Sequence, residues 1–338
     1  MASPEVNARK MIEDLQYHAG KYAKYALQAR KKYIELRLRQ DNEISKVYLR
    51  AIMRISQELK SLGDSENNLK ANELLAIQRA IAEEFERVNG EIDELVKQYI
   101  LDGVVAGTSY SQSIVLSALD KVGLNKAPVI KYFAKVNSQA AEAIYARTYN
   151  GLATSDRIWM TSKRASTAIR NIIQEAVVTG RDAVEVAEAL ERYIQTDART
   201  LSLQYPKMME RVKSRVPLRL PYEALRLART EMTAAFGEGV IAAGKVSPSY
   251  IGVRWILSPS HPVRDICDTF ANKDVGLGKG VYPKGQEPRF PPHPNCLCTL
   301  LPVYEEPDKL EKRLKEWLAD PSSHPDIEEW YRNIYTAA

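Results

Sequence analysis

Proline is distributed unevenly along this chain of 338 residues, and its distribution constrains the fold more than any other feature. Ten of the seventeen prolines lie between Pro248 and Pro307, whereas the sequence before Gly63 contains almost no helix breaker. Proline lacks a backbone N–H and clashes with the preceding turn inside a helix. The sequence therefore predicts long helices in the first part of the chain and a compact, turn-rich region near residues 248–307.

Residues 4–100 are predicted to be helical. Apolar residues recur at spacings of three to five from Leu27 to Leu59, which is the periodicity of an amphipathic helix. This stretch forms either one long helix or two helices that join near residues 40–42. Because no sustained heptad is visible, we expect residues 1–102 to be a region of long helices used for docking rather than a coiled coil.

Residues 103–221 are predicted to form a helical middle region built from shorter pieces. Breaks are expected at Gly103, Gly107, Gly123 and Pro128. Two further amphipathic helices follow, and a polar, basic connection then leads to the next helix.

Residues 222–306 are predicted to form a smaller α+β domain. A helix opens it, and residues 251–257 then alternate between apolar and polar, which indicates a strand. Residues 299–304 form a second short strand, in which Pro302 favours an edge position. Residues 307–338 are expected to be a helical tail. The predicted fold class is therefore mainly α, with long N-terminal helices and a short β-sheet in the C-terminal domain.

The composition is typical of a soluble globular protein, with 45% hydrophobic and 27% charged residues. No run of apolar residues is long enough to span a membrane, and the N-terminus lacks the apolar segment of a secretory signal. We therefore expect no membrane partner and synthesis in a reducing cytosol. Three cysteines cannot all pair there, so a metal site or buried thiols are expected instead of disulfides.

Positive charge is concentrated in residues 21–60. This segment holds eleven Lys and Arg residues against four Asp and Glu residues, a balance of +7 (11 − 4). Tyrosines are interleaved with these bases at positions Tyr22, Tyr25, Tyr33 and Tyr48. Such a face can meet nucleic acid or an acidic protein surface. The alternative interpretation is an ordinary solvated helix face.

All three cysteines lie in or beside a loop rich in proline and glycine. His293, Cys296 and Cys298 fall within six residues, and His261 and Cys267 lie upstream. Zinc takes four nitrogen or sulfur ligands in a tetrahedron, and such sites stabilise segments with little core of their own. Cys267, His293, Cys296 and Cys298 are thus candidate zinc ligands. The spacing differs from paired C-x₂-C knuckles, so buried thiols at the ends of two strands remain the alternative.

The triplet Arg229-Thr230-Glu231 is the other candidate site. Arginine and glutamate flank many sites for anions or sugars. The alternative, which we favour, is that both side chains form structural pairs joining their helix to the strand layer. No Ser-His-Asp or Cys-His arrangement is visible, so no catalytic residue is predicted. In a zinc enzyme, Asp265 and Asp268 would be the candidate acid and base.

Several of these segments occur in a recognisable order. The order along the chain is `DRIW`, `VVTGRDAVEVAEAL`, `RLARTEMTAAFGEG`, a tryptophan-containing strand, `RDICD` and finally `HPNCLC`. Over about residues 150–303, the chain resembles the Mu F-like head morphogenesis family, the minor head proteins of tailed phages. The signature positions of that family fall on Arg229, Thr230, Glu231, Asp265, Cys267, His293, Pro294, Asn295, Cys296 and Cys298.

The resemblance implies a minor capsid protein of the virion rather than an enzyme. Such proteins assemble in the host cytoplasm, associate with the portal protein and are packaged in the head interior or at the portal vertex. We further expect contacts with the major capsid or scaffolding protein and a role in DNA retention or delivery. Phage DNA would then bind through residues 21–60.

One position departs from the family pattern. Relatives often carry a second cysteine three residues after the first, and Phe270 stands at that place here. His293 or His261 is then the replacement ligand, or the metal has been lost. Two other functional classes stay open, namely a zinc-dependent or nucleotide-directed hydrolase or transferase, and a DNA-binding virion protein.

Overall fold

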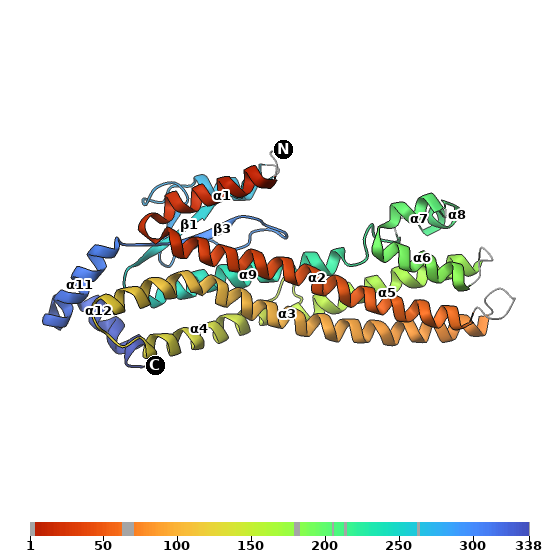
Figure 1. The fold of residues 1–338 in the computed structure, drawn as a ribbon, viewed down its shortest axis with the longest axis horizontal. Helices are drawn as coiled ribbons and strands as arrows, with labels where there is room; N and C mark the ends of the chain where they lie inside the picture. The colour runs from red at the N-terminus through yellow and green to blue at the C-terminus, as the bar shows by residue number, and fades with distance from the viewer. Residues whose placement is uncertain are drawn as a thin grey trace. The chain divides into compact units, whose positions relative to one another are not determined.

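The computed structural model describes residues 4–62, 71–178, 183–204, 206–212, 215–261 and 264–337. It confirms the mainly helical fold class with long N-terminal helices and a small sheet in the C-terminal part (Figure 1). The helices before the sheet are α1 (Pro4–Ala19), α2 (Ala23–Leu62), α3 (Ala71–Lys121), α4 (Ala127–Ala146), α5 (Thr154–Val178), α6 (Ala183–Gln195), α7 (Ala198–Gln204), α8 (Pro206–Val212) and α9 (Tyr222–Val246). The sheet region and tail contain β1 (Tyr250–Ile256), α10 (Ile266–Asn272), β2 (Val281–Pro283), β3 (Thr299–Tyr304), α11 (Pro307–Ala319) and α12 (Pro325–Trp330).

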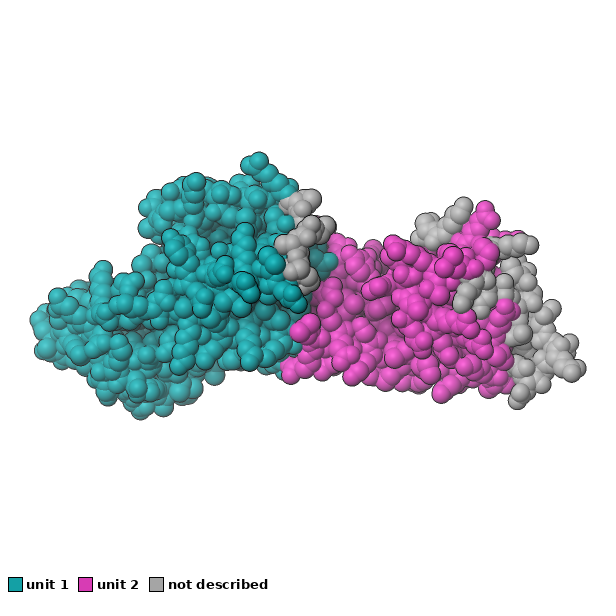
Figure 2. All heavy atoms as spheres, turned by 45° about the horizontal axis from the view of Figure 1, so that its top comes forward, with its two compact units in different colours: residues 1–37, 98–146, 230–338 teal, residues 38–97, 147–229 magenta. Residues whose placement is uncertain are grey.

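The chain divides into two compact units, each assembled from separate segments (Figure 2). Unit 1 comprises residues 1–37, 98–146 and 230–338, and unit 2 comprises residues 38–97 and 147–229. The borders therefore fall within α2, α3 and α9. Each unit combines segments from several of the regions predicted from the sequence.

The N-terminal helices differ from expectation in where they break. Helix α2 runs without interruption through residues 40–42, so the alternative with a joint there is wrong. The break lies instead at Gly20, which opens a short 3-10 turn and has a φ of +52°. Glycine adopts this left-handed conformation without the Cβ clash that penalises other residues, which explains why the helix ends at this position.

Two of the four predicted breaks in the middle region are wrong. Gly103 and Gly107 lie inside continuous α3, where they face α9. A Cβ added at Gly107 would overlap the carbonyl oxygen of Phe236, and one added at Gly239 would crowd the backbone of Val104. These glycines allow two helices to approach closely. The predicted break at Gly123 is confirmed, because α3 ends at Lys121 and α4 begins at Ala127.

The sheet of unit 1 is antiparallel with the strand order β2-β1-β3. Both predicted strands are confirmed, and Pro302 lies on the edge strand β3 opposite Val253 of the central strand. The three-residue strand β2 was not predicted, because it is too short to show a period. Helix α1 covers one face, where Leu15 shares an apolar cluster with Ile256 and Leu301.

The C-terminal tail helices pack onto a second apolar cluster of unit 1. Trp317 of α11 and Trp330 of α12 join side chains of α3, α4 and α9 in this cluster. The indole Nε1 of Trp330 donates to the carbonyl of Val246 at 2.7 Å, which anchors the tail to the end of α9. The predicted helical tail is thus confirmed.

Unit 2 is a helical bundle whose core is made of aliphatic and aromatic side chains. Tyr48 of α2 packs on Phe85 of α3, with ring centroids 6.4 Å apart. The Ser56 hydroxyl donates to the Ala187 carbonyl at 3.3 Å, which joins α2 to α6. Helices α7 and α8 occupy the stretch predicted to be a polar connection. Among the described residues of both units, no helix is long and apolar enough to cross a membrane.

Candidate metal centre

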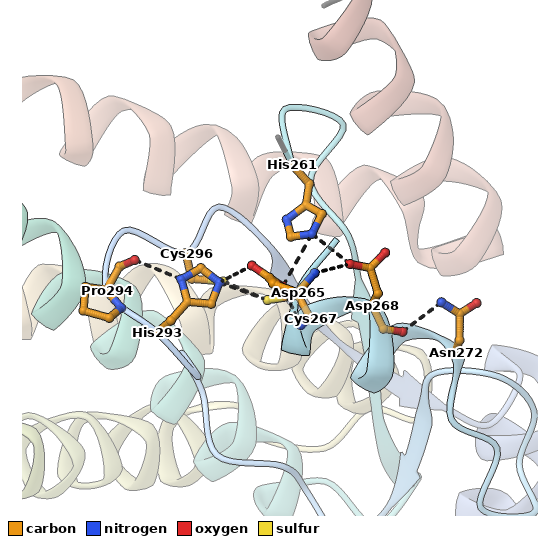
Figure 3. Close-up of polar contacts among 8 residues, drawn as sticks. All are labelled: His261, Asp265, Cys267, Asp268, Asn272, His293, Pro294 and Cys296. Atoms are coloured by element: carbon orange, nitrogen blue, oxygen red, sulfur yellow. Dashed lines mark hydrogen bonds and ion pairs between the residues drawn. The ribbon is translucent and has the colours of Figure 1, made fainter. Parts of the chain in front are cut away.

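Helix α10 positions the first cysteine of the cluster. Asp265 caps this helix by accepting from the backbone N–H of Cys267 at 2.7 Å. The Asp268 carboxylate accepts in return from the backbone N–H of Asp265 at 2.8 Å, which completes a capping box. The Cys267 side chain is consequently buried and held in one place (Figure 3).

His293 approaches Cys267 from the loop that precedes β3. Its Nδ1 donates to the Pro294 carbonyl at 2.9 Å, because a carbonyl oxygen can only accept. In the neutral ring, Nε2 then carries a lone pair, as in histidines that bind metals. This atom lies 3.3 Å from the Cys267 sulfur and 3.2 Å from the Asp265 carboxylate (Figure 3).

Cys296 completes a group of three ligand atoms. Its sulfur lies 3.7 Å from that of Cys267. The sulfurs of Cys267 and Cys296 and one ring nitrogen of His293 all lie within 4.8 Å of one another, so the cluster can hold a metal such as zinc. Electron pairs on three such atoms repel one another unless a proton or a cation lies between them. Thiolate sulfur and imidazole nitrogen are the donors that zinc binds, and the two thiols would give up their protons on binding the metal.

Cys298 lies near this group without belonging to it. The thiol of Cys296 hydrogen-bonds to its sulfur and lowers the pKa of Cys298 to about 6. The same contact, together with burial, raises the pKa of Cys296, and burial raises the pKa of Cys267. The guanidinium of Arg30 donates to the carbonyl of Leu297 at 3.4 Å and so anchors the loop between the last two cysteines.

His261 does not join the cysteines but forms a second group with two carboxylates. Its Nε2 lies 3.0 Å from an oxygen of Asp268 and 3.5 Å from one of Asp265 (Figure 3). The backbone N–H of Asp265 and then the ring of His261 lower the pKa of Asp268. Asp265 therefore contacts both histidines, with one oxygen toward each.

The Arg229-Thr230-Glu231 triplet is split between different partners. Arg229 donates to both oxygens of Asp41 on α2, at 2.7 and 2.6 Å, rather than to the strand layer as predicted. These hydrogen bonds raise the pKa of Arg229. The Thr230 hydroxyl accepts from the backbone N–H of Asn295 at 3.2 Å and ties the cysteine loop to α9. Glu231 is fully buried within α9.

Two features escaped the sequence reasoning. Asp41 was not recognised as the partner of Arg229, and no local sequence signal identifies a contact across 188 positions. Helix α10 was also missed, although the spacing of Asp265 and Asp268 is that of a capping box and could have revealed it.

Comparison of this chain with known proteins found no matching family model, curated protein or solved structure.

Proposed function

We propose that this chain is a minor head protein of a tailed phage, of the Mu F-like kind, that associates with the portal and is packaged in the head. The observation that carries the proposal is the meeting of three signature segments in unit 1. Thr230 of the `ARTE` segment contacts Asn295 of `HPNCLC`, and Cys267 of `RDICD` contacts His293 and Cys296. Segments that are far apart in the sequence thus form one cluster, which supports the resemblance.

The burial of the cluster supports a structural role over a catalytic one. Cys267, Cys296 and Cys298 are 0%, 1% and 2% exposed, and His293 is the one candidate ligand with a partly exposed side chain, at 33%. A catalytic zinc keeps one coordination position open to water or substrate, whereas a structural zinc is enclosed by four protein ligands. The proposed role is therefore assembly and interaction rather than hydrolysis or group transfer.

Zinc is the proposed metal, with Cys267, His293 and Cys296 as three ligands and Cys298 as the fourth. When bound, it would cross-link α10 to the segment before β3. Phe270 occupies the place of the family's extra cysteine and packs on Trp255, with ring centroids 4.8 Å apart. Tyr282 also donates to the Phe270 carbonyl at 2.9 Å. An aromatic contact here takes the place of the second cysteine that proteins of the resembled family often carry.

Helix α1 supplies the proposed docking surface for the portal. Its inward side chains Met11 and Leu15 are buried in the apolar cluster under the sheet, whereas Val6, Ile12 and Tyr17 are exposed. Val6 and Tyr17 are eleven residues, or about three helical turns, apart and therefore lie on the same side of α1, which is the side proposed for docking. This location agrees with the docking role proposed for residues 1–102.

Phage DNA binding through residues 21–60 receives less support. Many basic side chains of this segment bind carboxylates within the chain. Lys21 contacts Asp308, Lys31 contacts Glu35, Arg50 contacts Glu91, Arg54 contacts Glu84 and Lys60 contacts Glu191. These contacts are partly exposed and individually weak. They nevertheless reduce the positive charge that the segment presents to phosphates.

The test is capture of the full chain by a purified portal oligomer of a tailed phage, together with mass spectrometry of purified heads. We expect capture and presence in the head. The double variant V6S/Y17S should lose capture while keeping its melting temperature, and Y149S, which changes an exposed tyrosine of unit 2, should behave like the unmodified chain. Absence from heads and procapsids, with no portal capture, would contradict the proposal.

A further inference from the structure

Helix α5 of unit 2 carries a long stretch with positive charge only. Residues 157–174 contain four basic residues and no acidic one, and Asp156 and Glu175 bound this stretch. Most of the core-facing side chains of the helix are aliphatic, such as Ile158, Ile169 and Ile172. The remaining side chains create a polar, cationic face, which we call the α5 face. Its residues are Trp159, Lys163, Arg164, Thr167, Arg170 and Asn171.

Two hollows border the α5 face. Trp159 and Lys163 line both hollows, one of about 180 Å³ that also contacts Arg170 and one of about 710 Å³ that also contacts Arg164. Arg215 adds a further cation to the larger hollow. From Trp159 to Asn171 the helix rises about 18 Å, long enough to follow several nucleotides of a strand.

Trp159 differs from the other tryptophans of the chain. It is 44% exposed, whereas Trp255, Trp317 and Trp330 are 3%, 4% and 5% exposed. The ammonium of Lys163 lies 4.6 Å from the centre of its ring. An exposed indole beside lysine and arginine side chains has the chemistry of single-strand binding sites, in which bases stack on aromatic rings and cations meet phosphates.

We propose that the α5 face binds single-stranded nucleic acid, with a base stacked on Trp159 and phosphates on Lys163, Arg164 and Arg170. One carboxylate lines each hollow, Glu86 the smaller and Glu223 the larger, so the basic side chains outnumber the acidic ones in both. Arg164 lies 4.0 Å from Glu223 and Arg215 lies 3.6 Å from Glu175, and all four side chains retain exposure to solvent. Ion pairs of this kind contribute little and exchange readily for phosphate.

This surface is separate from the basic segment 21–60 and from the metal cluster, and its test needs neither heads nor portal. Because the other tryptophans are buried, quenching of intrinsic fluorescence reports mainly on Trp159. The full chain is titrated with an oligodeoxythymidylate of about 20 nucleotides, at several salt concentrations, with labelled-oligonucleotide anisotropy as a second readout. We expect the oligonucleotide to quench the fluorescence of Trp159 and to bind more weakly as the salt concentration rises.

Matched variants locate the contact. The triple variant K163Q/R164Q/R170Q should lower the slope of log K against log salt by about 2, since each phosphate contact to a single strand contributes about 0.7. W159A should weaken binding by at least about fivefold, the effect of losing one stacked base. The control K24Q/K31Q/K32Q, which removes three lysines of α2, should leave the binding unchanged.

Three outcomes would overturn the proposal. The first is unchanged affinity and salt slope in the triple variant. The second is quenching of Trp159 by polyglutamate as strong as that by the oligonucleotide at equal salt, which would make the partner an acidic peptide. The third is equal affinity for duplex and single-stranded DNA with no quenching of Trp159 fluorescence by either, which would exclude base stacking. Circular dichroism of each variant separates loss of binding from loss of fold.

Discussion

The cysteine loop of unit 1 and the helical bundle of unit 2 reach a fixed structure by different means. Over its described residues, 257–261 and 264–298, the loop contains only the short elements α10 and β2. The bundle has long helices with fully buried side chains such as Tyr48, Ile52 and Ile55. In the bundle, many apolar contacts share the stabilisation, whereas the loop depends on a few polar and sulfur contacts at defined positions.

This difference sets an expectation for mutations. In a distributed core, removing one side chain leaves a cavity and costs a few kcal/mol without changing the rest of the fold. In a segment held by few contacts, removing one member of the cluster releases the segment as a whole. Changes in the loop should therefore have larger effects than changes of similar size in the bundle.

The largest effect is expected for H293Q. Losing the ring nitrogen should lower metal affinity and reduce the free energy of unfolding of unit 1 by about 4 kcal/mol at free zinc a thousandfold above Kd. Calorimetry with and without added zinc measures it. H324Q is the matched control, because His324 pairs with Glu316 in the tail. Equal losses in both variants would contradict the special role of the loop histidine.

A loss of stability of comparable size, but without any loss of metal, is expected for I52A in the bundle. Ile52 is fully buried, so the cavity should cost about 2–5 kcal/mol of unfolding free energy. Unlike H293Q, this variant should keep the metal content of the unmodified chain. Elemental analysis of the purified variant checks this. Loss of metal in I52A would show that the two regions do not depend on separate interactions.

Two glycines of α3 should respond in opposite directions. G107A should cost about 1–3 kcal/mol because its Cβ would overlap the backbone of Phe236. G90A should instead stabilise the chain by about 1 kcal/mol, since no atom lies near the added methyl group and alanine favours the helix. Denaturant unfolding of both variants measures the difference. Stabilisation by G107A would disprove the close contact between α3 and α9.

The smallest effect concerns the ion pair of Arg229 with Asp41. Both side chains are 26% exposed, so solvent weakens the pair, and R229A should cost about 1–2 kcal/mol. R229K keeps the charge but loses the two parallel hydrogen bonds, so its free energy of unfolding should lie between those of R229A and the unmodified chain. A double-mutant cycle with D41N isolates the interaction. A coupling energy near zero would show that this ion pair does not stabilise unit 2.

Sequence periodicity predicted the long helices and the strand over residues 251–257, because burial imposes a period on such elements. The edge position of Pro302 was predicted separately, because proline has no backbone N–H to donate to a neighbouring strand. It could not predict that Gly103 and Gly107 are contact points rather than breaks, since that depends on Phe236 and Met232, more than a hundred positions away. Cys267, Cys296 and Cys298 were predicted to lie close together with His293 beside them, because the two strands must meet to form a sheet. The structure brings Cys267, His293 and Cys296 into one group, with Cys298 nearby. The separate placement of His261 with Asp268 depends on the cap of α10, which was missed.

The central claim is that a metal held by Cys267, His293 and Cys296, with the nearby Cys298 as the fourth ligand, fixes the cysteine loop. The most direct measurement is the metal content of the full chain purified without chelator, in parallel with C296S. The account predicts about one zinc per unmodified chain and none in C296S, with a lower melting temperature in the variant and after treatment with EDTA. An unmodified chain that carries no metal and whose melting curve is unaffected by EDTA would contradict it, and the loop would then be held by packed thiols alone.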